Sequence, residues 1–236
     1  MKGKKMVPFS THRPQLLRQR RSNMSFEIID APSPNFDERT RPIRYVVLHY
    51  TGMNNEEAAL NLLRDNLPKR EIYENHVPPH INPDGTIEPV PPNPPPRMNR
   101  VSAHYVVFED GRIFGLVPED KRAWQAGAGE YGGETNMNSA SIGIEICNGG
   151  HDFGLPDFAD KQIEAVMWLV EGIKKRHGLD KQHIIGHADL APHRKQDPGE
   201  KFPWHKFADR GISLKMPKGD SDGDNSVISQ IGATDD

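Results

Sequence analysis

The sequence has a single cysteine, no long apolar run and no surplus of basic residues, and each shortage excludes a class of protein. With Cys147 alone, no disulfide can form within one chain, which excludes a disulfide-stabilised scaffold. No segment approaches the roughly 20 consecutive apolar residues of a membrane-spanning helix, so we expect no stable membrane insertion. The net charge of −3 offers no concentrated basic surface for phosphates, so we expect no nucleic-acid partner.

An apolar fraction of 35% and 21 prolines indicate one domain accompanied by irregular segments. Residues 1–28 are basic and polar without periodicity, which predicts a flexible N-terminal segment. Residues 214–236 are rich in Gly, Ser and Asp, which predicts a flexible C-terminal tail. No apolar signal segment follows the basic N-terminus, so we expect a cytoplasmic protein, or a periplasmic one if the N-terminus shown is not the native one.

Residues 29–213 carry the periodic segments and predict a single α/β domain with a central mixed β-sheet flanked by helices. The pair Asp110-Gly111 between two apolar runs predicts a hairpin, and Gly178 marks the end of an amphipathic helix. The expected strands are 43–50, 102–108, 112–117, 141–147 and 183–185. The expected helices run from Asn54 or Asn55 to about 63, and over 158–177.

A proline-rich insertion over 67–100 interrupts this pattern. Nine of the prolines fall between Pro78 and Pro96, a density that excludes a helix or a central strand. Two interpretations remain open, namely a long surface loop that forms a wall of a binding cleft and a disordered insertion.

Polar residues stand at or near the ends of two apolar strands. His49 follows Val46-Val-Leu48, where a histidine is either a hydrogen-bonded core residue or a ligand that the sheet holds in place. Glu145 lies between Ile144 and Ile146. A glutamate in such a strand is either half of a structural salt bridge or a general base whose pKa is raised by burial.

The loop 186–199 is dense in ionisable residues and contains two prolines that anchor it. Pro192 and Pro198 limit its freedom, which favours a fixed display of its side chains over an ordinary solvated loop. Together with His49, this loop can supply two imidazoles and a carboxylate, the donor set that catalytic zinc uses. Its ionisable residues are His187, Asp189, His193, Arg194, Lys195 and Asp197.

Five segments, in order along the chain, resemble the type 2 N-acetylmuramoyl-L-alanine amidases, relatives of the peptidoglycan recognition proteins. The branch with the most similar motifs is that of the bacterial recycling and turnover amidases. The resemblance implies their α/β fold and zinc-dependent hydrolysis of the amide between the lactyl group of (anhydro-)N-acetylmuramic acid and L-Ala of the stem peptide. The partners it implies are peptidoglycan fragments, the muropeptides. The segments are 46–52, 102–107, 122–127, 141–145 and 186–199.

The resemblance also implies roles for individual residues. It makes His49, His187 and Asp197 the ligands of one Zn²⁺ per chain. It places Glu145 as the general base and Lys195 as a cation beside the metal. The expected substrate contacts are Tyr50, His104, Trp124, Gln125, Asn148 and Arg194.

Three of these assignments carry alternatives or departures. Gln125 stands where the branch usually has histidine, which leaves a contact to substrate or to a ligand open. Trp124 is either a stacking platform for substrate or a core residue, and His104 is either near the substrate or a buried structural histidine.

Two rival functions use the same fold. A peptidoglycan-binding module without catalysis would have lost a zinc ligand, commonly at the position of Asp197, and this chain retains all three. A zinc hydrolase of another amide would share the ligands and differ in its pocket. The sequence indicates neither the oligomeric state nor a preference between anhydro- and ordinary muramic acid.

Overall fold

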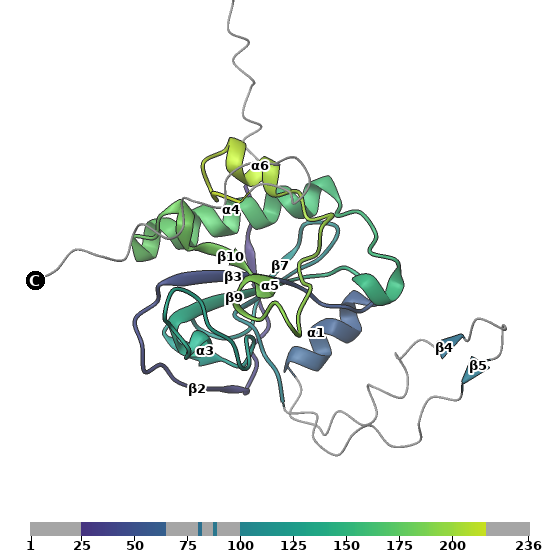
Figure 1. Cartoon of the computed structure of the whole chain (residues 1–236), viewed down its shortest axis with the longest axis horizontal. Helices are drawn as coiled ribbons and strands as arrows, with labels where there is room; N and C mark the ends of the chain where they lie inside the picture. The colour runs from purple at the N-terminus through teal and green to yellow at the C-terminus, as the bar shows by residue number, and fades with distance from the viewer. Residues whose placement is uncertain (1–24, 65–79, 82–86, 89–99, 216–236) are drawn as a thin grey trace, which may run out of the picture.

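A computed structural model describes residues 25–64, 80–81, 87–88 and 100–215. Its centre is a six-stranded sheet with helices on both faces (Figure 1). The strands of this sheet are β1 (Ile28–Asp30), β3 (Tyr45–Tyr50), β6 (Tyr105–Val107), β7 (Ile113–Gly115), β9 (Ser141–Ile146) and β10 (Ile184–Gly186). The helices are α1 (Glu56–Arg64), α3 (Met137–Ala140), α4 (Asp160–His177), α5 (His187–Leu190) and α6 (Trp204–Asp209), with single 3₁₀ turns η1 (His151–Phe153) and η2 (Lys181–His183).

The strand order in the sheet is β1-β7-β6-β9-β3-β10, and only the β6–β7 pair is antiparallel. That pair is the predicted hairpin, and Gly111 in its turn has φ +84, a conformation that glycine adopts without strain. The predicted mixed sheet flanked by helices is therefore confirmed. Two further strands, β2 (Phe36–Glu38) and β8 (Lys121–Ala123), pair antiparallel beside the main sheet.

The longest helix, α4, covers one face of the sheet together with α6 (Figure 1). Its apolar residues recur at helical spacing and pack against Leu48 of β3 and Ile144 of β9. Gly178 ends the helix in the left-handed conformation, as the sequence predicts. The residues of α4 in this core include Ile163, Val166, Val170 and Ile173.

The opposite face of the sheet is covered by α1 and α3 (Figure 1). The side chain of Asn55 caps α1, because its Oδ1 accepts a hydrogen bond of 2.9 Å from the N–H of Ala58. Leu60 and Leu63 then pack against Val106 and Phe108. Because side chains alternate along a strand, Val47 and His49 face this side while Leu48 faces α4.

Several short elements were absent from the sequence prediction. β1 begins at Ile28, at the end of the segment 1–28 for which we expected flexibility, and pairs with β7. The helix α5 occupies the start of the loop 186–199. Within the insertion 67–100, the structure describes β4 (His80–Ile81) and β5 (Ile87–Glu88), which pair with each other, and residue 100. Most of this insertion and most of both tails lie outside the described residues.

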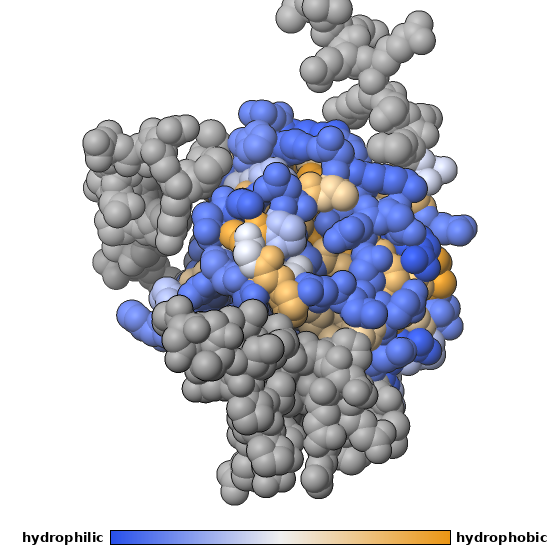
Figure 2. Space-filling view, turned by 90° about the vertical axis from the view of Figure 1, so that its right-hand side faces the viewer, coloured by the Kyte–Doolittle hydropathy of each residue, from blue (hydrophilic) through white to orange (hydrophobic). Residues whose placement is uncertain are grey.

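The described surface carries few large apolar side chains. Those that are exposed are Ile28, Phe36, Trp168 and Leu214. Figure 2 shows one face that is predominantly hydrophilic, where hydrophobic residues reach the surface in small separate areas. Across the described ranges, no helix combines the length and apolar character needed to span a bilayer.

Candidate active site

Three adjacent parallel strands carry the candidate site at their carboxyl ends. β3 pairs in parallel with β9 on one side and with β10 on the other, so all three strands end at the same edge of the sheet. The register sets His49 opposite Glu145. Gly186 lies opposite Leu48, so His187 enters the site directly after β10. Ligand sites of α/β folds are usually found at this edge.

The loop that follows α5 folds back to bring Asp197 to the two histidines. The N–H of Ala188 donates a hydrogen bond of 2.9 Å to the carbonyl oxygen of Asp197. Gly186 permits the close approach of this loop, since a Cβ there would lie 2.7 Å from Cδ of Pro198. The fixed loop expected from its prolines is therefore anchored to the end of β10.

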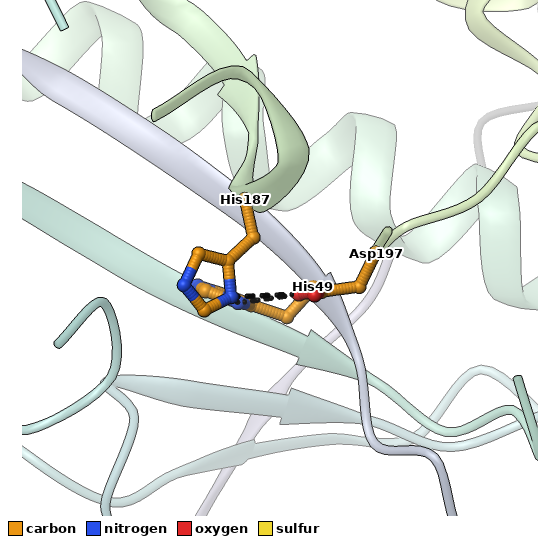
Figure 3. A group of neighbouring side chains, drawn as sticks. All are labelled: His49, His187 and Asp197. Atoms are coloured by element: carbon orange, nitrogen blue, oxygen red, sulfur yellow. Dashed lines mark hydrogen bonds and ion pairs between the residues drawn. The ribbon is translucent and has the colours of Figure 1, made fainter. Parts of the chain in front are cut away.

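His49, His187 and Asp197 converge on one point from three different segments (Figure 3). The two Nδ1 atoms lie 2.9 Å apart, and each lies 2.9 Å from Oδ2 of Asp197. Donor atoms around a tetrahedral zinc ion with bonds of about 2.0–2.1 Å lie roughly 3.3 Å apart, so only a small expansion is needed to admit the ion. All three residues are buried, with at most 6% of their surface exposed.

The outward-facing nitrogens of both histidines already have partners. His187 Nε2 lies 2.9 Å from the carbonyl oxygen of Ala126, which can only accept, so this nitrogen carries the hydrogen. In the neutral ring, Nδ1 is then a lone pair directed at the cluster. His49 Nε2 lies 2.6 Å from Oε1 of Gln125. Two inward nitrogens and a carboxylate oxygen therefore fit a cation.

The pKa shifts in the cluster indicate that its centre favours positive charge. Burial alone would raise the pKa of Asp197, but hydrogen bonds with His187 and His49 outweigh it and hold this pKa below its ordinary value. Burial and the charge of His49 lower the pKa of His187 to about 4. Burial also acts to lower the pKa of His49, but the carboxylates of Glu145 and Asp197 raise it overall. The neighbouring carboxylates thus favour positive charge at this point, which a bound metal ion would supply.

Glu145 lies beside this cluster without a full set of partners. Its Oε2 is buried and has no hydrogen-bond partner among the described residues, although part of the residue reaches the cleft. Burial raises the pKa of Glu145 to about 7, and the positive charges of His49 and Lys195 act in the opposite direction. A carboxylate with a pKa near neutrality is suited to accept and return a proton.

A cleft of about 480 Å³ opens over the cluster and Glu145. Its lining includes the apolar side chains of Met53, Leu62 and Leu63 as well as polar and charged ones. A second cavity of about 620 Å³ shares Trp124, Gln125, His187 and Lys195 with the first, and both include Arg194. Arg100 and Arg122 add further positive charge to the second cavity, whose one described carboxylate is Asp37.

The structure brings together most of the residues singled out in the sequence. Tyr50, Trp124, Gln125 and Arg194 line the cleft with the cluster, Glu145 and Lys195. Trp124 is partly exposed there, and its Nε1 donates a hydrogen bond of 2.8 Å to Asp37. The Arg194 guanidinium donates to the carbonyl oxygens of Ala126 and Ala128, which leaves it less free to hold substrate.

Two predicted substrate contacts, His104 and Asn148, are not among the described residues that line the cleft. His104 is fully buried; its Nδ1 accepts from the N–H of Gly143 at 3.0 Å, and its Nε2 donates to the carbonyl oxygen of Lys121 at 3.1 Å. Burial lowers the pKa of His104 to about 3, so the ring is neutral. Asn148 bridges Gly150 and Pro156 within the loop after β9. These positions favour structural roles for both residues.

Among the cleft residues that the sequence did not single out is His151. His151 Nδ1 lies 2.9 Å from the hydroxyl of Tyr50, and its Nε2 lies 2.9 Å from a carboxylate oxygen of Glu200. A histidine shortly after an apolar strand, preceded by two glycines, repeats the signal that singled out His49. The carbonyl of Ala126 carries no such signal, because every residue has one.

Two imidazoles and a carboxylate at the ends of parallel strands, with an open cleft and a neighbouring glutamate, are the arrangement of a metal-dependent hydrolase. The chain belongs to the N-acetylmuramoyl-L-alanine amidase family, whose sequence profile matches residues 39–200. The resemblance seen in the motifs is therefore confirmed.

Similar proteins include two bacterial amidases. The chain is 33% identical to N-acetylmuramoyl-L-alanine amidase AmiD of Escherichia coli over 72% of its length, but this match spans only 54% of AmiD. It is 31% identical to 1,6-anhydro-N-acetylmuramyl-L-alanine amidase AmpD of Haemophilus influenzae, over 74% of this chain and 87% of AmpD. The solved complex of E. coli AmiD with anhydro-N-acetylmuramic acid-L-Ala-D-γ-Glu-L-Lys has a TM-score of 0.56 and 31% identity, covering 72% of this chain and 58% of that chain.

Proposed function

We propose that this chain is a zinc-dependent amidase that hydrolyses the bond between the lactyl group of N-acetylmuramic acid, in its ordinary or anhydro form, and L-Ala of the stem peptide. The observation that carries the proposal is the convergence of His49, His187 and Asp197 beside Glu145 in a member of the amidase family. The similarity to AmiD, whose solved complex contains an anhydromuramyl tripeptide, supports a muropeptide substrate in peptidoglycan turnover and recycling.

Zinc is the metal that the donor set favours, with one ion per chain. Two imidazole nitrogens and one carboxylate oxygen, with space left for water, are typical of catalytic zinc, whereas Mg²⁺ and Ca²⁺ prefer oxygen donors. When bound in such a site, zinc polarises the scissile carbonyl and lowers the pKa of a water molecule toward 7. The burial of all three donors supports a tightly held ion.

Glu145 and Lys195 would then carry the proton and charge chemistry. Glu145, whose Oε2 has no hydrogen-bond partner among the described residues, accepts the proton of the attacking water and returns it to the departing amine of L-Ala. Lys195 lines both parts of the cleft and stabilises negative charge that develops on the amide oxygen. Neither step requires the side chain of His104.

The lining of the cleft suits a ligand that combines a sugar ring with a charged peptide. Tyr50 and Trp124 offer aromatic surface for a sugar ring or the peptide backbone. Arg100 and Lys195 of the second cavity complement the carboxylates of a stem peptide, whereas Arg122 is paired with Asp37 and Arg194 with backbone carbonyls. Gln125 is engaged with His49 and is a weaker candidate for substrate contact.

We further propose that the amidase domain comprises residues 29–213, with 1–28 and 214–236 as flanking segments. The family match over 39–200 supports this extent, and β1 extends the sheet one residue beyond the proposed start, to Ile28. A cytoplasmic location stays a prediction from the sequence. Cell fractionation tests it, and a periplasmic location would contradict it.

Mass spectrometry of a purified anhydromuramyl tripeptide after incubation with zinc-loaded protein tests the function. Release of free stem peptide is expected with wild-type protein, and none after chelation or with Glu145→Gln. A parallel panel of unrelated acyl amides should stay intact. An intact muropeptide, or faster cleavage of another amide, would refute the proposal.

A further inference from the structure

A chain of three hydrogen bonds links the backbone of α3 to the ring of His49. The hydroxyl of Ser141 lies 2.6 Å from the carbonyl oxygen of Met137. Nε2 of Gln125 lies 2.8 Å from Oγ of Ser141, and Oε1 of Gln125 lies 2.6 Å from Nε2 of His49. The chain reaches the candidate metal ligand His49 at Nε2, the ring nitrogen that faces away from His187 and Asp197.

The donors and acceptors along this chain can run in one direction only. The carbonyl of Met137 only accepts, so it takes the single hydroxyl hydrogen of Ser141. Ser141 Oγ can then only accept from Gln125, which turns the amide NH₂ toward Ser141 and the amide oxygen toward His49. His49 must therefore carry its ring hydrogen on Nε2.

We propose that Gln125 is the positioning residue that fixes His49 in the tautomer a metal ligand requires. With the hydrogen on Nε2, the neutral ring directs the lone pair of Nδ1 at the point where His187 and Asp197 converge. In the other tautomer, Nδ1 would present a hydrogen to the metal instead of a lone pair. The inference rests on the proposed metal site and names the residue of this chain that prepares His49 to bind the metal.

The surroundings of Gln125 hold its side chain in this place. The backbone N–H of Gln125 donates a hydrogen bond of 3.0 Å to Oδ1 of Asn138. The same oxygen accepts a hydrogen bond of 2.7 Å from the backbone N–H of Ala126. The side chain lies against β9 at Gly143, where an added Cβ would lie 2.5 Å from Cγ of Gln125. Glycine at 143 is thus needed for Gln125 to reach His49.

The neighbouring residue performs the same task for the second histidine. The carbonyl oxygen of Ala126 accepts from Nε2 of His187 at 2.9 Å. One short segment, held by Asn138, therefore sets both rings, through a side chain at 125 and through the backbone at 126. Partners of this kind typically change metal affinity by about 10- to 100-fold when they are removed.

The test is the zinc dissociation constant, measured by competition with a chromophoric chelator for four proteins. Gln125→Met keeps the length of the side chain but removes its acceptor, and we expect zinc to bind about 10- to 100-fold more weakly. Gln125→Glu retains an acceptor for His49 Nε2–H, and we expect affinity within a few fold of wild type. Gln162→Met is the matched control, because Gln162 is a buried glutamine of α4 that donates to Val107 and Cys147.

A ring ¹⁵N spectrum of histidine-labelled zinc protein separates positioning from general damage to the fold. In wild type and Gln125→Glu, His49 should show a protonated Nε2 and a metal-bound Nδ1, and in Gln125→Met this signature should weaken or be lost. Equal zinc affinity in wild type and Gln125→Met overturns the inference alone. An equal loss in Gln162→Met, or no rescue by Gln125→Glu, also overturns it. Failure of wild type to bind zinc would overturn the metal site itself.

Discussion

Replacing Glu145 with glutamine should stabilise the metal-free protein at neutral and alkaline pH while it removes the proposed proton acceptor. The reason is the position of this carboxyl group, which is mostly surrounded by protein and has an oxygen without a partner among the described residues. Glutamine has nearly the same shape and carries no charge. The substitution therefore relieves the cost of holding a carboxylate in this place.

The magnitude follows from the pKa of Glu145, which is about 7 in the folded protein and 4.5 for an ordinary glutamate. This difference corresponds to about 3 kcal/mol of unfolding free energy. Because part of the residue faces water in the cleft, we expect a measured gain of about 2 kcal/mol. A gain of this size shifts the folding equilibrium roughly 30-fold.

The pH dependence of the gain has a definite sign. Below pH 4.5, Glu145 is protonated in both folded and unfolded chains, so the variant should match wild type. As the pH rises, the unfolded chain loses its proton first, and wild-type stability falls until the folded carboxyl also ionises near pH 7. The advantage of Glu145→Gln should therefore grow between pH 4.5 and 7 and stay constant above.

Urea unfolding followed by tryptophan fluorescence, with a chelator present, measures this at pH 4.5, 6 and 8. Glu57→Gln is a suitable control, because the side chain of Glu57 is 65% exposed and the substitution should change stability little at any pH. If Glu145→Gln is no more stable than wild type at pH 8, Glu145 has a compensating partner and the argument for a raised pKa is refuted.

Three further predictions concern the metal, the reaction and the core. Asp197→Ala should lose tightly bound zinc, because it removes the charged donor; a full zinc content by atomic emission would exclude Asp197 as a ligand. Turnover by the zinc enzyme should fall on the acid side of neutrality, since Glu145 must be ionised to accept a proton, and the midpoint should lie below the metal-free pKa of about 7 because bound zinc favours the ionised form; a kcat/KM profile that stays flat down to pH 5 would contradict this. His104→Ala should lower the unfolding free energy by about 2–4 kcal/mol, through a cavity and an unpaired Gly143 N–H; a change in KM at unaltered stability would instead indicate a substrate contact.

The sequence was most informative where burial decides local structure. The continuous apolar run of β3 and the helical spacing of α4 predict both elements to within a few residues, because each must bury a face against the other. β1, β2 and β8 escaped prediction for the opposite reason. They are three residues long and partly exposed, and they pair with segments distant in sequence, so no local pattern marks them.

For the candidate site, residue types pointed to the cluster but not to its support. His49, His187 and Asp197 stood out through their chemistry, and the motifs implied their common role. The donor and acceptor roles that fix the tautomer of His49 are set by the backbone carbonyl of Met137. They are transmitted by the hydrogen bonds of Ser141 and Gln125. Such a path depends on how three segments meet in space, which spacing along the chain does not encode.

The three candidate ligands also come from parts of the chain that are synthesised at different times. His49 and Asp197 are 148 positions apart, and the cluster includes no pair closer than the 10 positions between His187 and Asp197. A nascent chain therefore cannot capture its ion until the last of these residues has emerged, by which point β3, β9 and β10 have all been synthesised. Tight metal binding is therefore expected only after these strands have paired. An ion that binds only the native state then stabilises that pairing against unfolding.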